Sequence, residues 1–374
     1  MLKTSSDKAG ASTVKKHFDY TYPPIRRLAT RCLPVFDYAK IVCSGVNTVV
    51  HGSYYTTNVG DRAIGLALRN ELKRLGVRSV LTSRFCRRPP VRNVVVGGGG
   101  VIHNNYDGNL SLRTDFVDGT RNVVYAGVGC PGFAPLSQDD ERALSKMRKA
   151  RYVSVRDSSS RDILTSVVDV TPEVLSCPAW LLRRNLDQSD PSPISWLFTT
   201  YYNLRYRRGL SSHLPSDATE RERIGVVPNG LLDIRWWPQL RRLLHRLSKE
   251  ADLWFVPFAG KDIEFCQREL SGVQAECCPL QGPIGTFRTI MAMDKVVAAR
   301  YHSLIFATLA GRPVMIVPYS QKMVSLARDL NLTMVEFGSS AEDAAFNMRF
   351  DEALVDEKIK KAETLVRRIV EHLE

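Results

Sequence analysis

Three features are missing from the sequence, and each absence excludes a class of protein. No run of about 18 apolar residues occurs, as a membrane-spanning helix would need, because Arg300, His302 and Arg312 interrupt the most apolar stretch. Residues 1–20 are polar and lack the apolar segment of a secretory signal. The 8 cysteines are scattered, without a Cys-x-x-Cys pair. We therefore expect a cytoplasmic protein with reduced thiols and no bound metal.

What the chain does contain is an ordinary globular composition with an excess of positive charge. Of 374 residues, 44% are hydrophobic and 24% are charged, which is typical of a soluble domain protein. The length fits two domains better than one. The 52 Lys and Arg exceed the 39 Asp and Glu, giving a net charge of +13. This excess favours anionic partners, namely phosphorylated substrates, nucleic acid or an acidic membrane surface.

The chain divides by composition into an arm, two domains and a linker. Residues 1–40 form an N-terminal arm in which basic residues outnumber acidic ones. Residues 41–185 and 223–374 each alternate strand and helix signals, and the second part ends in an amphipathic helix. Residues 186–222 begin with LDQSDPSPISW, which we interpret as a linker. Two domains of one type are therefore expected.

Both domains show short apolar runs that alternate with helical patterns. The expected strands lie in 47–53, 79–83, 93–99, 122–129 and 152–157, and then in 223–230, 252–259, 295–300 and 313–319. The expected helices lie in 61–76, 137–150, 237–250, 284–293, 303–311 and 351–374, and Ser137 is a predicted N-cap. Strands that are apolar throughout indicate parallel sheets covered on both faces. The pattern predicts an α/β protein with two Rossmann-like domains and ligands at the carboxyl ends of the strands.

Asn58, Gly60 and Asp61 follow the first expected strand. Asp61 suits an N-cap and Gly60 suits a turn, so local structure accounts for both. The functional alternative places Asn58, Asp61 and the first-turn amides in the cleft, facing an anionic or hydroxyl-rich ligand. We therefore keep Asn58 and Asp61 as candidate substrate-binding residues.

Two glycine-rich segments follow strands. Residues 97–100 are consecutive glycines, which indicates close approach by a ligand or another backbone, and we assign Gly98, Gly99 and His103 to a substrate-binding loop. The segment GVGCPGF at 127–133 has the spacing of a dinucleotide fingerprint, but its helix begins too late for a pyrophosphate to reach the helix N-terminus. We interpret that second segment as a turn.

Cations lie at the ends of three expected strands. Arg156 can grip a carboxylate or phosphate with two donors, whereas the adjacent Asp157 can simply cap a helix. Arg300 and His302 alternate across Tyr301, so in extended backbone both point to one side. A lone histidine at a strand end is commonly structural, but Arg300 beside it and Lys322 after the next strand favour an anion site.

Basic clusters at 84–92 and 201–209 mix arginines with aromatic residues. Nucleic acid can bind such patches, but no homeodomain, zinc-finger or RNP-type signature accompanies them. A solvated surface, or a face toward anionic lipid at the inner side of a membrane, is the simpler interpretation. A non-catalytic protein that binds anions or nucleic acid remains one hypothesis.

The motifs together resemble those of the polysaccharide pyruvyl transferase family. NVGDRAIG, VVVGGGG, YVSVRDSSSRDIL and ARYHSLIFATLAGRPVMIVPYSQK occur in the family's order and spacing, from about Asn47 to about Leu332. The resemblance implies a GT-B-like arrangement of two domains. It also implies transfer of the enolpyruvyl group of phosphoenolpyruvate onto a saccharide, forming a pyruvate ketal in cell-surface or exopolysaccharide biosynthesis. Family acceptors are commonly glycans assembled on lipid carriers.

The resemblance also implies roles for the candidate residues. Arg156, Arg300 and Lys322 would bind phosphoenolpyruvate, mainly from the C-terminal domain, and the N-terminal domain would hold the acceptor. His302 would be the catalytic residue, donating a proton to the methylene carbon or taking one from a hydroxyl. No cofactor is required beyond this donor substrate. A glycosyltransferase using a sugar nucleotide on the same fold is the alternative.

One position departs from the family pattern. Where the family often shows Asp-Pro, this chain has Cys177 followed by Pro178. If that aspartate shapes the cleft or the acceptor site, we expect the acceptor of this chain to differ.

Overall fold

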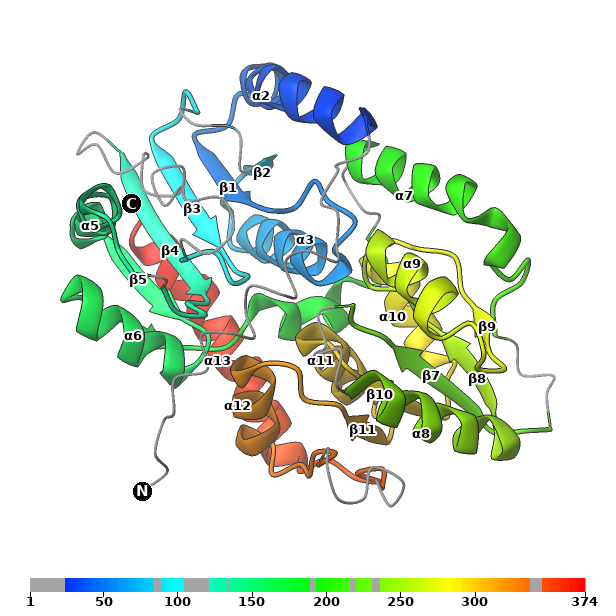
Figure 1. Ribbon diagram of the computed structural model, residues 1–374. Helices are drawn as coiled ribbons and strands as arrows, with labels where there is room; N and C mark the ends of the chain where they lie inside the picture. Colours follow the sequence, from blue (N-terminus) through cyan, green and yellow to red (C-terminus); the bar gives the residue numbers. More distant parts are fainter. Residues whose placement is uncertain are drawn as a thin grey trace.

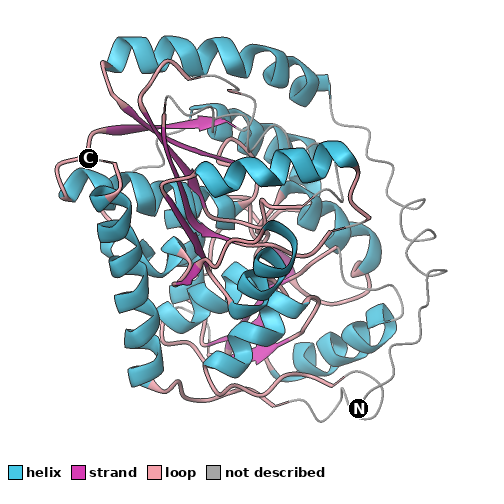
Figure 2. Cartoon of the chain, turned by 90° about the vertical axis from the view of Figure 1, so that its left-hand side faces the viewer, coloured by secondary structure: helices cyan, strands magenta, loops and turns pink. Residues whose placement is uncertain are grey.

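Two parallel sheets, each flanked by helices, make up the computed structural model (Figures 1 and 2). The structure describes residues 24–83, 86, 89–103, 121–133, 135–188, 193–215, 220–230, 236–336 and 345–373. Residues 1–23 of the predicted arm and part of the basic cluster at 84–92 lie outside the described residues.

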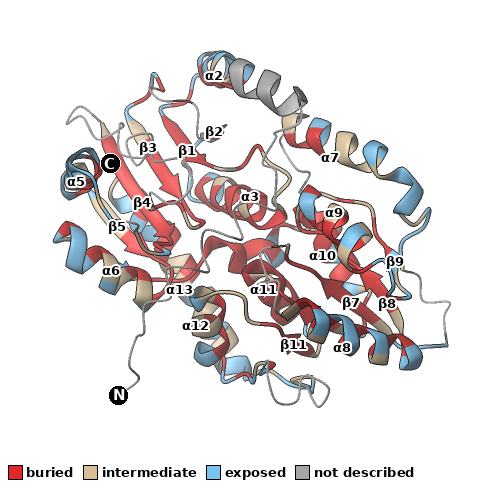
Figure 3. Cartoon of the chain, viewed as in Figure 1, coloured by how far each residue is buried: buried red, intermediate tan, exposed pale blue. Residues whose placement is uncertain are grey.

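The first sheet has the strand order β2-β1-β3-β4-β5-β6, and every neighbouring pair is parallel. Its strands are β1 (Thr48–Gly52), β2 (Ser79–Ser83), β3 (Asn93–Gly97), β4 (Asn122–Val128), β5 (Tyr152–Val155) and β6 (Glu173–Val174). The central strands are buried along almost their whole length, as their valine-rich sequences predict (Figure 3).

The second sheet has the order β11-β10-β7-β8-β9 and is also parallel throughout. Its strands are β7 (Arg223–Val227), β8 (Asp252–Phe255), β9 (Glu276–Cys277), β10 (Lys295–Ala298) and β11 (Val314–Ile316). The prediction of an α/β fold with two Rossmann-like domains is confirmed.

Helices cover both sheets. Those of the first half are α2 (Pro24–Ser44), α3 (Val59–Arg74), α5 (Gln138–Ser145) and α6 (Ser158–Val168), with the 3₁₀ turns η1 (Lys146–Lys149) and η2 (Pro178–Asn185). Those of the second half are α8 (Trp237–Glu250), α9 (Gly260–Glu269), α10 (Pro283–Met291), α11 (Tyr301–Leu309) and α12 (Gln321–Asp329). Ser137 caps α5 as predicted, because its hydroxyl accepts a hydrogen bond from the amide of Asp140.

The start of α3 differs from the prediction. Asn58, rather than Asp61, is the N-cap, and its side-chain oxygen accepts hydrogen bonds from the amides of Gly60 and Asp61. The helix therefore begins at Val59, two residues earlier than its apolar periodicity indicates. Asparagine is as good a cap as aspartate, so composition alone cannot choose between the two positions.

The chain crosses between the two sheets twice. The segment interpreted as a linker contains a helix, α7 (Pro193–Arg205), and a 3₁₀ turn, η3 (Arg207–Gly209), before the second sheet begins. The last helix, α13 (Glu352–Glu371), follows the second domain in sequence but packs against the first sheet (Figure 1). There Leu365 lies over Gly127 of β4, and the side chain of Asn122 donates to the carbonyl of Leu373.

The two domains share one apolar core. Ile64 and Leu68 of α3 belong to the same buried cluster as Phe258, Phe287 and Phe306 of the second domain. Backbone contacts reinforce this packing, because the amide of Val59 donates to the carbonyl of Phe258 at 2.8 Å. The helix N-termini that follow β1 and β10 therefore meet at the domain interface.

We predict that Leu365→Ala lowers the free energy of unfolding by about 2–5 kcal/mol, because it opens a cavity between α13 and the first sheet. Leu354→Ala, in the partly buried first turn of the same helix, is the matched control and should cost clearly less. Urea denaturation followed by tryptophan fluorescence measures both. Equal losses would mean that α13 is not anchored through Leu365.

Candidate active site at the domain interface

The candidate residues of the two halves converge where the domains meet. Arg156 follows β5, and Cys177 precedes η2 in the first domain. Arg300 and His302 lie at the N-terminus of α11, and Lys322 lies in the first turn of α12. These residues come from strand ends and helix starts, which is where parallel α/β sheets bind ligands.

The backbone at Arg300 corrects the sequence-based geometry. β10 ends at Ala298 and α11 already begins at Tyr301, so His302 is helical and does not alternate with Arg300 along a strand. Arg300 itself is extended (φ −134°, ψ 144°) as the N-cap residue, and its amide donates to the hydroxyl of Ser303. The interpretation that both side chains point one way because the backbone is extended was wrong.

Arg300 is anchored by protein groups of its own domain. Its Nη2 donates to Oδ1 of Asp262 on α9, and its Nε donates to the carbonyl of Pro228 at 3.1 Å. Asp262 is fully buried, and its Oδ2 accepts the amides of Phe258 and Ala259 at 2.9 Å each. Burial raises the pKa of the Asp262 carboxyl, whereas the charge of Arg300 opposes that rise. Arg300 therefore connects the segments that follow β7 and β10 to the first turn of α9.

Arg156 is held from the other domain by stacking and close packing. Its guanidinium carbon lies 4.6 Å from the ring centroid of Tyr301, a cation–π contact across the interface. A Cβ added at Gly129 would lie 2.5 Å from the Nη2 of Arg156. A side chain at position 129 would therefore collide with the guanidinium in this position. Asp157, 3.4 Å from the Nε of Arg156, caps α6 by accepting the amide of Ser160.

His302 lies between the two domains. A Cβ added at Gly60 would overlap its imidazole, so the ring rests directly on the backbone of α3. Its Nε2 is 3.7 Å from the Sγ of Cys177. Burial lowers the pKa of His302 well below its ordinary value, and the charges of Arg156, Lys322 and Arg300 lower it further. The imidazole is therefore neutral at neutral pH.

Lys322 approaches the same region from α12. Its Nζ lies 5.4 Å from the ring centroid of Tyr319. Burial alone would raise the pKa of Tyr319, but the positive charges of Lys322 and Arg300 outweigh it and lower that pKa. The sequence-based reasoning missed Tyr319, Tyr301 and Asp262. Tyr319, the last residue of the predicted strand 313–319 and three residues before Lys322, was the available signal.

The N-terminal candidates have local structural roles. Asn58 caps α3, and its Nδ2 also donates to Oδ2 of Asp61 at 3.0 Å. Gly98 and Gly99 have positive φ (53° and 77°), and a Cβ at Gly98 would overlap Ile64 of α3. Helix α3 therefore makes at least part of the close approach that the sequence predicted at these glycines. His103 is half-buried at the end of a described segment.

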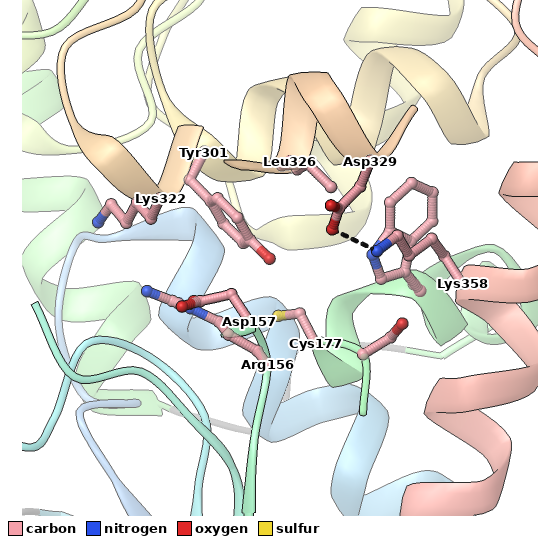
Figure 4. A pocket seen from close by; sticks show the side chains of 10 residues that line it. Arg156, Asp157, Cys177, Tyr301, Lys322, Leu326, Asp329 and Lys358 are labelled. Atoms are coloured by element: carbon pink, nitrogen blue, oxygen red, sulfur yellow. Dashed lines mark hydrogen bonds and ion pairs between the residues drawn. The ribbon is translucent and has the colours of Figure 1, made fainter. Parts of the chain in front are cut away.

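A small pocket between the domains joins part of this set (Figure 4). Its lining comprises Arg156, Asp157, Ser176, Cys177, Trp180, Tyr301, Lys322, Leu326, Asp329 and Lys358. The ring of Tyr301 lies over Arg156, and an ion pair of Lys358 with Asp329, 2.7 Å, lies on one side. Its volume of about 10 Å³ is enough for roughly one water molecule. Arg300 and His302 are outside this lining. So are the N-terminal candidates, namely Asn58, Asp61, Gly98, Gly99 and His103.

Within the described ranges, no group of three or more His, Cys, Asp or Glu side chains is arranged to hold a metal ion. Among the described helices, none has the length and apolarity needed to cross a bilayer.

We predict that Asp262→Ala destabilises the protein by about 3–5 kcal/mol, because it leaves the guanidinium of Arg300 without its buried counter-charge. The matched control is Glu357→Ala, which removes an exposed partner of Lys361 on α13 and should cost about 0.5 kcal/mol or less. Thermal or urea unfolding distinguishes the two. A loss at Asp262 as small as that at Glu357 would contradict the anchoring role.

Several solved structures have a similar fold. S. aureus MnaA, solved with UDP, is 11% identical with a TM-score of 0.52, covering 87% of this chain and 95% of its own. UDP-GlcNAc 2-epimerase from Methanocaldococcus jannaschii is 7% identical with a TM-score of 0.53, covering 87% of this chain and 99% of its own. At such identities the likeness concerns the fold alone, and the predicted GT-B-like arrangement of two Rossmann-like domains is confirmed.

Sequence comparison identifies a family. No curated protein matches the chain, but a family model described as polysaccharide pyruvyl transferase matches residues 58–321. That range contains Arg156, Cys177, Arg300 and His302, and it ends one residue before Lys322. The match spans well over half of the chain, which therefore belongs to the polysaccharide pyruvyl transferase family, a family of transferases that act on polysaccharides.

Proposed function

We propose that the protein transfers the enolpyruvyl group of phosphoenolpyruvate onto a saccharide and closes it into a pyruvate ketal. The observation that carries this proposal is a neutral histidine, His302, between cations contributed by both domains. Family membership supports a transferase over a non-catalytic anion-binding protein.

Phosphoenolpyruvate suits the charge of this interface. Its carboxylate and phosphate are anions, and Arg156 and Lys322 line the pocket while Arg300 lies close enough to lower the pKa of His302. Buried cations are costly without counter-charges, and Asp157 and Asp262 neutralise only part of the set. A multiply charged anion would therefore be bound with charge-assisted hydrogen bonds.

His302 is suited to act as a base. Because its imidazole is neutral, it can take the proton of a sugar hydroxyl as that oxygen adds to the central carbon of the donor. The methylene carbon gains a proton in the same addition. A second hydroxyl then attacks the same carbon as the C–O bond to phosphate breaks, so one proton ends on the methyl group and one is released with the phosphate. The reaction needs no oxidant, reductant or further cofactor.

The acceptor would approach from the N-terminal domain. Asp61, Gly99 and the loop that reaches His103 form that side, and the Gly99 Cα faces Oδ1 of Asp61. Asn58 would act indirectly, by holding Asp61 through its amide. The acceptor sugar is a unit of a cell-surface glycan or exopolysaccharide in this proposal, and the reaction takes place in the cytoplasm.

The pocket must enlarge to admit the donor. A volume of about 10 Å³ accommodates one water molecule and excludes a three-carbon phosphate ester. The pocket lies between domains, so a rotation of one domain against the other would open it. Closure on the donor would then bring Arg156 and Lys322 onto the same anion and exclude water from the reaction.

We predict phosphate release from phosphoenolpyruvate in the presence of a suitable acceptor from a panel of galactosyl, glucosyl and N-acetylmannosaminyl saccharides. His302→Ala should lower kcat by about 10²–10⁴-fold with donor affinity changed only a few-fold. His245→Ala, on the exposed face of α8, is the matched control and should leave kcat unchanged.

Two results would contradict this proposal. One is absence of both phosphate release and calorimetric binding of phosphoenolpyruvate, especially if UDP- or CMP-sugars raise the melting temperature instead, which would favour a glycosyltransferase. The other is normal turnover by His302→Ala, which would remove His302 from the mechanism while leaving the donor assignment intact.

We predict that Cys177→Asp moves the acidic limb of the kcat/KM profile to higher pH. An aspartate near Nε2 would favour the imidazolium and raise the pKa of His302, and a base that is protonated cannot accept a proton. The wild-type limb should lie below pH 6.5, because the pKa of His302 is lowered. Cys177→Ser is the neutral control and should keep the wild-type limb. A common profile for all three would contradict the role of His302 as base.

A further inference from the structure

Helix α2 buries Leu33, Asp37 and Ile41 against the first domain and exposes apolar side chains on its other side. Its buried side chains include Asp37, whose Oδ2 accepts the amide and hydroxyl of Ser83 at 2.9 and 2.6 Å. Lys40 also turns inward and donates to the hydroxyl of Tyr55 and the carbonyl of Leu81. The outer side of the helix is apolar instead, with exposed residues at helical spacing that comprise Cys32, Val35, Phe36, Ala39, Val42 and Cys43.

Exposing these apolar side chains to water is costly, and the attachment of α2 to the first domain does not require it. Val35 is 72% exposed and Val42 is 69% exposed, although aliphatic side chains gain free energy when they are buried. Leu33, Ile41 and the hydrogen bonds of Asp37 already attach the helix to the first domain. Of the outer stripe, Phe36 contacts the ring of Tyr55, whereas Val35 and Val42 remain mostly exposed.

Helix α7 repeats the arrangement. Its inner side buries Phe198 and also makes polar contacts, since Ser195 donates to the carbonyl of Tyr54 and Asn203 bonds both the amide and the carbonyl of Leu280. Its outer side carries Trp196, which is 65% exposed, together with the exposed Leu197 and Leu204. Leu197 and Leu204 are separated by two helical turns, so they lie on one face.

The two helices lie on the same edge of the molecule (Figures 1 and 3). Consecutive residues connect them, because Tyr54 accepts a hydrogen bond from α7 while Tyr55 is bonded by Lys40 of α2. We define the docking edge as the outer faces of α2 and α7, represented by Val35, Val42, Trp196 and Leu204. It comprises exposed apolar side chains from two helices and not a single exposed side chain.

Positive charge accompanies the docking edge. Arg205, Arg207 and Arg208 are exposed at the end of α7 and in the following turn. Aliphatic stripes with an interfacial tryptophan and flanking cations suit the boundary between anionic headgroups and acyl chains.

The charge and the chemistry of the stripe select one occupant. A second copy of this chain would place Arg205, Arg207 and Arg208 opposite the same three arginines, and like charges oppose such pairing. Nucleic acid would match the charge, but Val35 and Val42 offer it neither stacking nor hydrogen bonds. We propose that the docking edge binds the surface of an anionic lipid membrane, with the apolar faces of α2 and α7 inserted among the headgroups. This goes beyond the proposed transfer reaction and does not depend on it.

Vesicle binding by the full chain tests this proposal. We predict co-sedimentation with vesicles of phosphatidylcholine and phosphatidylglycerol in equal parts, at about 0.15 M salt, and at least tenfold weaker partition onto phosphatidylcholine alone. Val35→Ser/Val42→Ser/Trp196→Ser should weaken binding to the anionic vesicles at least tenfold. The matched control, Val167→Ser/Met291→Ser/Met348→Ser, removes exposed apolar side chains elsewhere and should bind as the wild type does.

A second pair of variants isolates the charge. Arg207→Glu/Arg208→Glu should weaken binding about tenfold or more, whereas Arg241→Glu/Arg242→Glu on α8 should change it much less. Circular dichroism and the single variant Trp196→Ser separate lost binding from lost folding. The proposal is overturned if the wild type does not bind, or if both serine variants lose binding equally. It is also overturned if the edge variant instead abolishes a dimer detected by light scattering.

Discussion

The contact between the imidazole of His302 and the backbone of Gly60 is the constraint on which the interface depends. It brings the N-terminus of α11 directly onto the N-terminus of α3, with no room for a side chain at position 60. Because these helix N-termini are in contact, the ring of Tyr301 lies against the guanidinium of Arg156, and the Nε2 of His302 lies near the Sγ of Cys177. The candidate site is therefore a product of how closely two backbones from different domains approach.

Electrostatics at this contact are unbalanced in one direction. The interface gathers Arg156, Arg300 and Lys322 around a histidine that burial keeps uncharged. The acidic groups beside them are already engaged, since Asp157 caps α6 and Asp262 holds Arg300 and two backbone amides. This excess of positive charge is what the proposed anionic donor would neutralise, and the lowered pKa of Tyr319 is a further response to the same charges.

The sequence was most informative where structure is local. Runs such as 94–96 and 296–298 predicted buried parallel strands because valine-rich segments flanked by helices have few other solutions, and Ser137 was found as a cap from its neighbours. Contacts between distant residues could not be predicted in this way. The bond of Arg300 to Asp262 and the packing of Leu365 on Gly127 join positions far apart in sequence. The predicted side-chain direction of His302 was also wrong, because β10 ends at Ala298, before the end of the apolar run, and His302 is already in α11.

The position of α13 has a mechanical consequence. Because this last helix returns to the first sheet, two separate segments of backbone join the domains. Two tethers do not permit free separation or twisting, and they restrict relative motion to rotation about a line that passes through both. Relative motion of the two domains is thus a hinge-like swing, during which the ion pair of Glu363 with Arg184 of η2 keeps α13 on the first domain.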